Sequence, residues 1–130
     1  MTIEIKYERM SEEFEKFHLG DGKVLHHFTG TDRGGPHDHP WSFESQILSG
    51  GYIERVYHPG PNNTWSSELI HRRPGDKFKV TSNHIHEIFE LPTGECWTIV
   101  EAGPYEREVR FWKFDEESVT SRTCHEDNYS

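Results

Sequence analysis

The sequence is poor in apolar residues. Only 32% of its 130 residues are hydrophobic, and the mean hydropathy is −0.89. This composition lies near the limit at which a chain can bury enough apolar surface to fold. Four Trp, five Tyr and eight Phe compensate for the shortage, because each aromatic side chain can bury roughly 150–250 Å². We therefore expect a single domain with short strands around a small aromatic core.

Basic residues, long apolar runs and cysteines are also scarce. Fourteen Lys and Arg against 23 Asp and Glu give a formal charge of −9, which disfavours non-specific binding to nucleic acid or anionic lipid. No apolar run approaches the roughly 18–20 residues that cross a bilayer, and the first residues lack a targeting pattern. We therefore predict a cytoplasmic protein with no nucleic-acid or membrane partner. Its two cysteines, Cys96 and Cys124, are then expected to be reduced.

One segment near the N-terminus has the pattern of a short helix. Ser11 can cap a helix that ends at Gly20. Met10, Phe14 and Phe17 then fall at helical spacing and form one apolar stripe. We predict a helix here that packs on the remainder of the domain.

The rest of the chain consists of brief β-forming runs separated by turn residues. The predicted strands are Lys23–Thr29, Glu44–Leu48, Tyr52–Tyr57, Trp65–His71, Lys77–Thr81, His86–Leu91, Cys96–Glu101 and Glu106–Phe114. Such spacing is typical of a sandwich or barrel. We divide the chain into an N-terminal strand and helix (1–22), a β-barrel (23–114) and a polar C-terminal tail (115–130) that frays.

The ten histidines are the most unusual feature. In His37-Asp-His39 the two imidazoles share one face of an extended chain, and such a pair can bind one metal ion at about 2.0–2.1 Å. Glu44 begins the next run and can supply an oxygen ligand. A third imidazole is expected from His84-Ile-His86, which also presents two rings on one face.

These residues resemble the two motifs of the cupin superfamily. The first motif, H-x-H-(x)3–4-E-(x)6-G, is matched by His37, His39, Glu44 and Gly51. The second is resembled by Pro74-Gly-Asp76, the strand Lys77–Thr81, the turn Ser82-Asn83 and His86. The H-P-W string that begins at His39 is also similar to a set of small uncharacterised cupins of bacteria and phages.

The resemblance implies an all-β, single-domain cupin-type β-barrel, also described as a double-stranded β-helix or jelly roll. It implies one divalent transition metal held by His37, His39, Glu44 and His86, with His84 as a rival for the third histidine. Fe(II) is favoured, and Mn, Ni, Zn and Cu are alternatives. A homodimer is the expected assembly.

The function implied is that of an Fe(II)-type, dioxygenase-like enzyme acting on a small polar metabolite inside the barrel. Two alternatives stay open: a metal-dependent isomerase, epimerase or lyase of the same class, and a non-catalytic cupin that binds a small ligand. Arg55 is a candidate for gripping a carboxylate or phosphate of the substrate. The aromatic residues predicted to line the pocket are Trp41, Tyr52 and Trp97.

Overall fold

The computed structural model describes residues 4–31 and 35–130. In these residues the chain forms eleven strands and no helix, and every paired strand is antiparallel to its partner. The all-β class and the strands predicted between residues 23 and 114 are therefore confirmed, with ends that differ by a few residues. The described part of the chain contains no helix long and apolar enough to cross a membrane.

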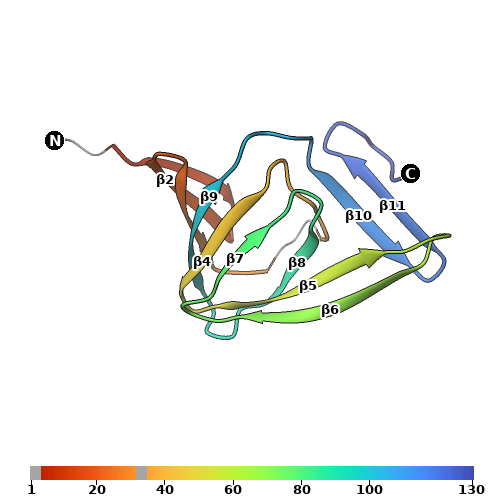
Figure 1. Ribbon diagram of the computed structural model, residues 1–130, viewed down its shortest axis with the longest axis horizontal. Coiled ribbons are helices and arrows are strands. Elements are labelled where there is room, and N and C mark those ends of the chain that lie inside the picture. The colour runs from red at the N-terminus through yellow and green to blue at the C-terminus, as the bar shows by residue number, and fades with distance from the viewer. Residues whose placement is uncertain (1–3, 32–34) are drawn as a thin grey trace.

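The strands form three sheets around a shared interior (Figure 1). The six-stranded sheet contains, in spatial order, β1 (Lys6–Ser11), β2 (Phe14–Gly20), β3 (Lys23–Phe28), β9 (Cys96–Ala102), β4 (Phe43–Ser49) and β7 (Lys77–Val80). The three-stranded sheet contains β6 (Trp65–Arg72), β5 (Tyr52–Pro59) and β8 (Ile85–Glu90), and the third pairs β10 (Arg110–Asp115) with β11 (Ser118–Thr123). Single bridges from His37 to His86 and to Phe111 link the three-stranded sheet to β10–β11. No strand pairing among the described residues joins these to the six-stranded sheet, so backbone pairing does not close one barrel.

The N-terminal helix prediction is wrong, because the segment forms a β-hairpin of β1 and β2. The two phenylalanines of the predicted stripe point to opposite faces of β2. Phe14 stacks on Phe28 at 4.4 Å between ring centroids, whereas Phe17 stacks on Trp97 at 5.8 Å. A helix this short is marginal by itself, and pairing with β3 satisfies the backbone of β2 instead.

The C-terminal segment, which was expected to fray, contains strand β11. It pairs with β10 over its whole length, from Ser118 opposite Asp115 to Thr123 opposite Arg110. Ser121 and Thr123 are buried. The polar composition concealed a strand because its alternate small polar side chains are covered without being apolar.

The core is small, as the composition predicts, but it is less aromatic than expected. One cluster joins Phe28, Ile47, Tyr52, Ile88 and Cys96. Phe28 and Tyr52 are the only aromatic side chains among the buried hydrophobic residues that the structure describes. Several of the other rings stack in partly exposed groups between sheets or line the interior cavity.

Gly51 lies at a tight turn, where its backbone closely approaches the end of β6. It has a φ of 80°, and a Cβ there would lie 2.5 Å from the carbonyl oxygen of Arg72. Gly94 is a matched control, since its φ is 86° and an added Cβ meets nothing within 4 Å. We expect Gly94→Ala to lower the free energy of unfolding by about 1–2 kcal/mol through the left-handed backbone alone. Gly51→Ala should cost about 1–3 kcal/mol more because of the steric clash.

Denaturant unfolding of the two variants measures both losses. Equal losses would show that the close approach of Gly51 to β6 does not contribute to stability.

Candidate metal centre

The His37–His39 segment is held against the start of β8 by backbone hydrogen bonds. The His37 N–H donates to the His86 carbonyl at 2.9 Å, and the His86 N–H donates back at 3.0 Å. The His39 N–H donates to the carbonyl of Ser82 at 3.0 Å. This pairing brings the two predicted motifs, which are far apart in the sequence, to the same place.

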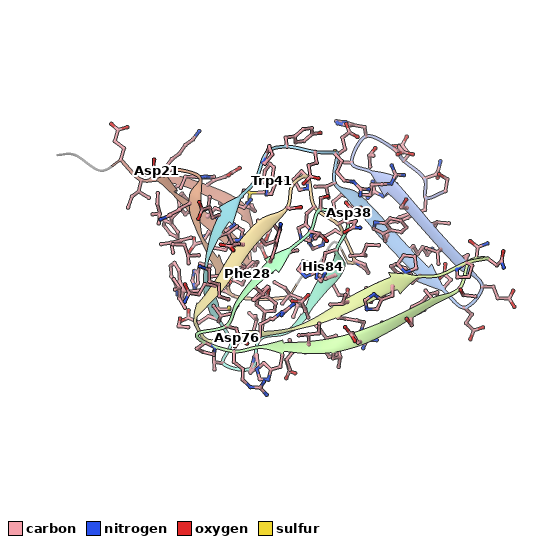
Figure 2. All side chains as sticks on the ribbon, in the orientation of Figure 1. Asp21, Phe28, Asp38, Trp41, Asp76 and His84 are labelled. Carbon is pink, nitrogen blue, oxygen red and sulfur yellow. The ribbon has the colours of Figure 1, made fainter. Side chains whose placement is uncertain are left out.

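Asp38, between the two histidines, points to the opposite side and anchors the segment to β10. Its side chain is 1% exposed. It accepts hydrogen bonds from the Arg110 N–H at 2.7 Å and the Trp112 Nε1–H at 3.1 Å, and it forms an ion pair with Arg107 at 3.1 Å. Figure 2 shows Asp38 in the interior near β10. The flanking imidazoles are thereby left on the other face, as strand alternation predicts.

Three of the predicted histidines come together in the structure. The ring centroids are 5.5 Å apart for His37 and His39, 5.0 Å for His37 and His86, and 4.9 Å for His39 and His86. One ligand nitrogen from each ring lies within 4.8 Å of the others. The cluster is formed by one loop segment and one strand.

The Nδ1 atom of each of these rings forms a hydrogen bond. The acceptors are the carbonyl of Gly35 for His37 at 3.1 Å, the carbonyl of His84 for His39 at 3.1 Å, and the Glu54 carboxylate for His86 at 3.2 Å. Carbonyl and carboxylate oxygens accept hydrogen bonds and do not donate them, so each Nδ1 carries the proton. The lone pair of each ring is therefore on Nε2, and hydrogen bonds of this kind orient histidine ligands in metal sites.

The protonation of the cluster also suits a metal. Burial, followed by the charges of the neighbouring histidines, lowers the pKa of His39 to about 2. Burial likewise lowers the pKa of His86, although the hydrogen bond to Glu54 opposes the effect. Neutral imidazole is the form that coordinates metal ions.

Glu54 is the residue that sequence reasoning missed. It is 0% exposed on β5, and its carboxylate contacts His84 Nε2 at 2.7 Å, His86 Nδ1 at 3.2 Å and Arg72 Nε at 2.9 Å. Burial alone would raise the pKa of Glu54, but the hydrogen bonds from His84, His86 and Arg72 hold it well below its usual range. The buried group is thus an ionised carboxylate. The alternation of Glu54 with Tyr52 and Val56, both buried, is the sequence signal that could have identified it.

Glu44 does not join the histidines. Its side chain is 56% exposed and lies 3.9 Å from Lys77 Nζ on the outer face of β4. Ser45, the next residue, lines the interior cavity instead. Because successive side chains of a strand alternate between faces, the predicted ligand position falls one residue from the inward-facing one.

A second group, Glu54, His84 and His86, also has its polar atoms within 4.8 Å of one another. Its closeness is explained by the hydrogen bonds of the Glu54 carboxylate. His84 uses Nε2 to reach Glu54 and its backbone carbonyl to accept from His39. His84 therefore helps to orient the three-histidine cluster through its hydrogen bonds to Glu54 and His39.

The cluster lies on the wall of a cavity of about 350 Å³. Two of the four predicted ligand-binding side chains, Trp41 and Tyr52, line it. Trp97 and Arg55 are not among the described residues of its lining. Trp97 stacks on His27 at 4.0 Å, and the Arg55 guanidinium lies 5.0 Å from the centre of the Phe89 ring.

The buried carboxylate and its exposed counterpart give a matched pair of variants. We expect Glu54→Gln to lower the free energy of unfolding by about 3–5 kcal/mol, because it removes the charge that compensates Arg72. It should also weaken Zn²⁺ binding about 10–100-fold, since the amide replaces a charged acceptor that orients the His86 and His84 rings. Glu44→Gln should change stability by less than about 0.5 kcal/mol and leave Zn²⁺ affinity unchanged.

Denaturant unfolding and competitive zinc titration measure the two effects. Loss of zinc affinity in Glu44→Gln but not in Glu54→Gln would contradict the placement of both carboxylates.

Neither the known family models nor the curated proteins include a match to this sequence. Solved structures do resemble this chain. Fe(II) HppE matches with a TM-score of 0.55 and 10% identity, over 77% of this chain and 57% of that one. The Drosophila melanogaster CENP-C cupin domain matches at 0.54 and 6%, over 77% and 76%. KdgF from Halomonas sp. matches at 0.54 and 15%, over 78% and 89%.

The match spans little more than half of HppE but most of the CENP-C cupin domain and of KdgF. At these identities the likeness establishes the fold and no activity. The chain has the cupin fold, with a candidate metal centre of histidines supported by a glutamate.

Proposed function

We propose that the protein is a metal-dependent cupin that binds one divalent transition metal through the Nε2 atoms of His37, His39 and His86. The observation that carries the proposal is the hydrogen bonding of all three Nδ1 atoms, which leaves the Nε2 lone pair of each ring in the cluster available to a metal ion. Fe(II) is the favoured ion, because imidazole suits iron and the similar HppE structure is that of the Fe(II) form. Mn, Ni, Zn and Cu are the alternatives.

The proposed activity is a dioxygenase-like reaction on a small molecule in the cavity. A bound divalent ion would supply Lewis-acid or oxygen-activating chemistry, with positions left open by only three protein ligands. The chain's own residues provide the rest. Glu54 and the backbone carbonyls fix the rings, and Trp41, Phe43 and Tyr52 exclude water from the cavity wall.

The cavity changes the expected substrate class. Its lining is largely aromatic and aliphatic, with Phe14, Phe28, Ile88, Val100 and Val109 among its members. Apolar walls with a few polar groups select ligands that have an apolar body. We therefore propose a substrate that has an apolar part, in place of the small polar metabolite expected from the sequence.

Metal content tests the proposal directly. We expect elemental analysis of untagged protein to find one divalent transition metal per chain. His37→Ala, His39→Ala and His86→Ala should each weaken metal binding at least about tenfold. His84→Ala should bind metal more tightly than these three, because its Nε2 already faces Glu54. Absence of metal, or loss of it only in His84→Ala, would contradict the proposal.

The same preparations test the reaction class. Fe(II)-loaded protein should consume dioxygen when offered hydroxy acids, diketones or thiols that carry an apolar group, and His86→Ala should not. Turnover under anaerobic conditions with Zn or Mn would instead indicate an isomerase, epimerase or lyase. Metal binding without turnover across the panel would indicate a ligand-binding protein. Either result would replace the dioxygenase-like activity.

A further inference from the structure

Lys16 and His26 form a pair of polar side chains on the cavity wall, on strands other than those that hold the three histidines. They are directly opposite each other in the β2–β3 ladder, and both line the cavity. Opposed side chains on one face of a sheet lie about 4.5–5.5 Å apart at Cβ. An ammonium group and an imidazole therefore face the same part of the interior.

Among the described residues no carboxylate forms an ion pair with the Lys16 ammonium, and the charge of Glu8 acts on it only from a distance. The ammonium lies 5.5 Å from the centre of the Phe14 ring. Glu8 is its neighbour in the β1–β2 ladder, but Glu8 is paired with His18 at 2.9 Å and its side chain is 49% exposed. Burial lowers the pKa of Lys16 and the charge of Glu8 only opposes this, so the charge is poorly compensated where it stands.

His26 likewise forms no hydrogen bond or ion pair with another side chain that the structure describes. Its ring contacts Phe14 and Phe28 edge-on, with centroids at 5.0 and 6.0 Å. Burial, then the charges of Lys16 and His18, lowers the pKa of His26 to about 3. It is therefore a neutral ring in which one nitrogen is an N–H donor.

The rest of the described lining offers no competing charge. Asp38 is the only carboxylate of the lining, and its oxygens already accept from Arg110 and Trp112 and pair with Arg107. The other members are mainly aromatic and aliphatic. Among the described residues of the lining, Lys16 is thus the one lysine or arginine, and the one carboxylate, that of Asp38, is already hydrogen-bonded.

From this arrangement we infer that Lys16 and His26 bind the anionic group of the ligand, which is a small organic acid with an apolar body. The carboxylate accepts hydrogen bonds from the Lys16 ammonium and the His26 ring, and the body packs on Phe14, Phe28 and Tyr52. The inference deepens the proposed function. It rests on that proposal only for the role of the three histidines in the same cavity. Charge-assisted hydrogen bonds of this type contribute more than neutral ones.

The test compares an acid with its neutral isostere. Binding of 3-phenylpropanoate and 3-phenylpropanamide is measured by calorimetry on metal-free and on Zn²⁺-loaded protein. We expect the acid to bind at least about tenfold more tightly than the amide in both metal states. Lys16→Met should bring the two affinities together in metal-free protein, and Lys16→Arg should retain the preference. Lys77→Met, which removes an exposed lysine beside Glu44, should change neither affinity.

Each result is decisive. Failure of metal-free protein to bind the acid, or an equal affinity for acid and amide, would overturn the inference. A preference that requires Zn²⁺ and survives Lys16→Met would show that the anion binds the metal, which overturns the role of Lys16 but leaves the proposed function intact. A Lys16-dependent preference in a protein that never takes up metal would support the anion site and contradict the metal proposal. Circular dichroism on each variant confirms that it is folded.

Discussion

The ionised carboxylate of Glu54, buried in the middle strand of the three-stranded sheet, is the constraint on which the site depends. A charge with no solvent contact must be compensated locally or the fold loses several kcal/mol. Its partners come from both neighbours of β5: Arg72 at the end of β6, His86 in β8, and His84 just before β8 begins. Satisfying this one group therefore fixes how the three strands are registered and which way the His86 ring faces.

The same hydrogen bonds extend to the first motif. His84 reaches Glu54 with its ring and accepts from His39 with its backbone carbonyl, so the orientation of His39 also depends on the carboxylate. His37 joins through its backbone pairing with His86. The Glu54 carboxylate thus organises the three rings. The metal would bring the positive charge that the cluster itself lacks, and Lys16 adds another on the cavity wall.

The sequence predicted what depends on local pattern and motif spacing. Alternation and turn residues gave most strands, and the H-x-H pattern together with the Pro74–His86 spacing identified three rings that do come together. The predictions that were wrong concern segments whose structure depends on the strand that they pair with. The pattern from Ser11 to Gly20 fits a helix in isolation. In the fold the segment pairs with strand β3 instead, and this long-range pairing is not encoded in the local pattern.

The prediction of the carboxylate in the site was wrong for a related reason. Glu44 fits the motif spacing, yet strand alternation turns it to solvent and leaves Ser45 facing inward. Glu54 has no motif to mark it, and a buried charge is visible only when Arg72 and His84 are known to lie beside it. Lys16 was hidden inside the predicted helix, where it had no relation to the cavity.

The claim that three Nε2 atoms bind one ion is tested most directly by nuclear magnetic resonance of the imidazole nitrogens. Long-range correlation spectra of ¹⁵N-labelled, metal-free protein should show His37, His39 and His86 protonated at Nδ1. Adding one equivalent of ¹¹³Cd²⁺ should then produce cadmium–nitrogen couplings at the Nε2 atoms of these three rings. Protonation at Nε2 in the metal-free protein, or coupling at Nδ1 or to His84, would contradict the account.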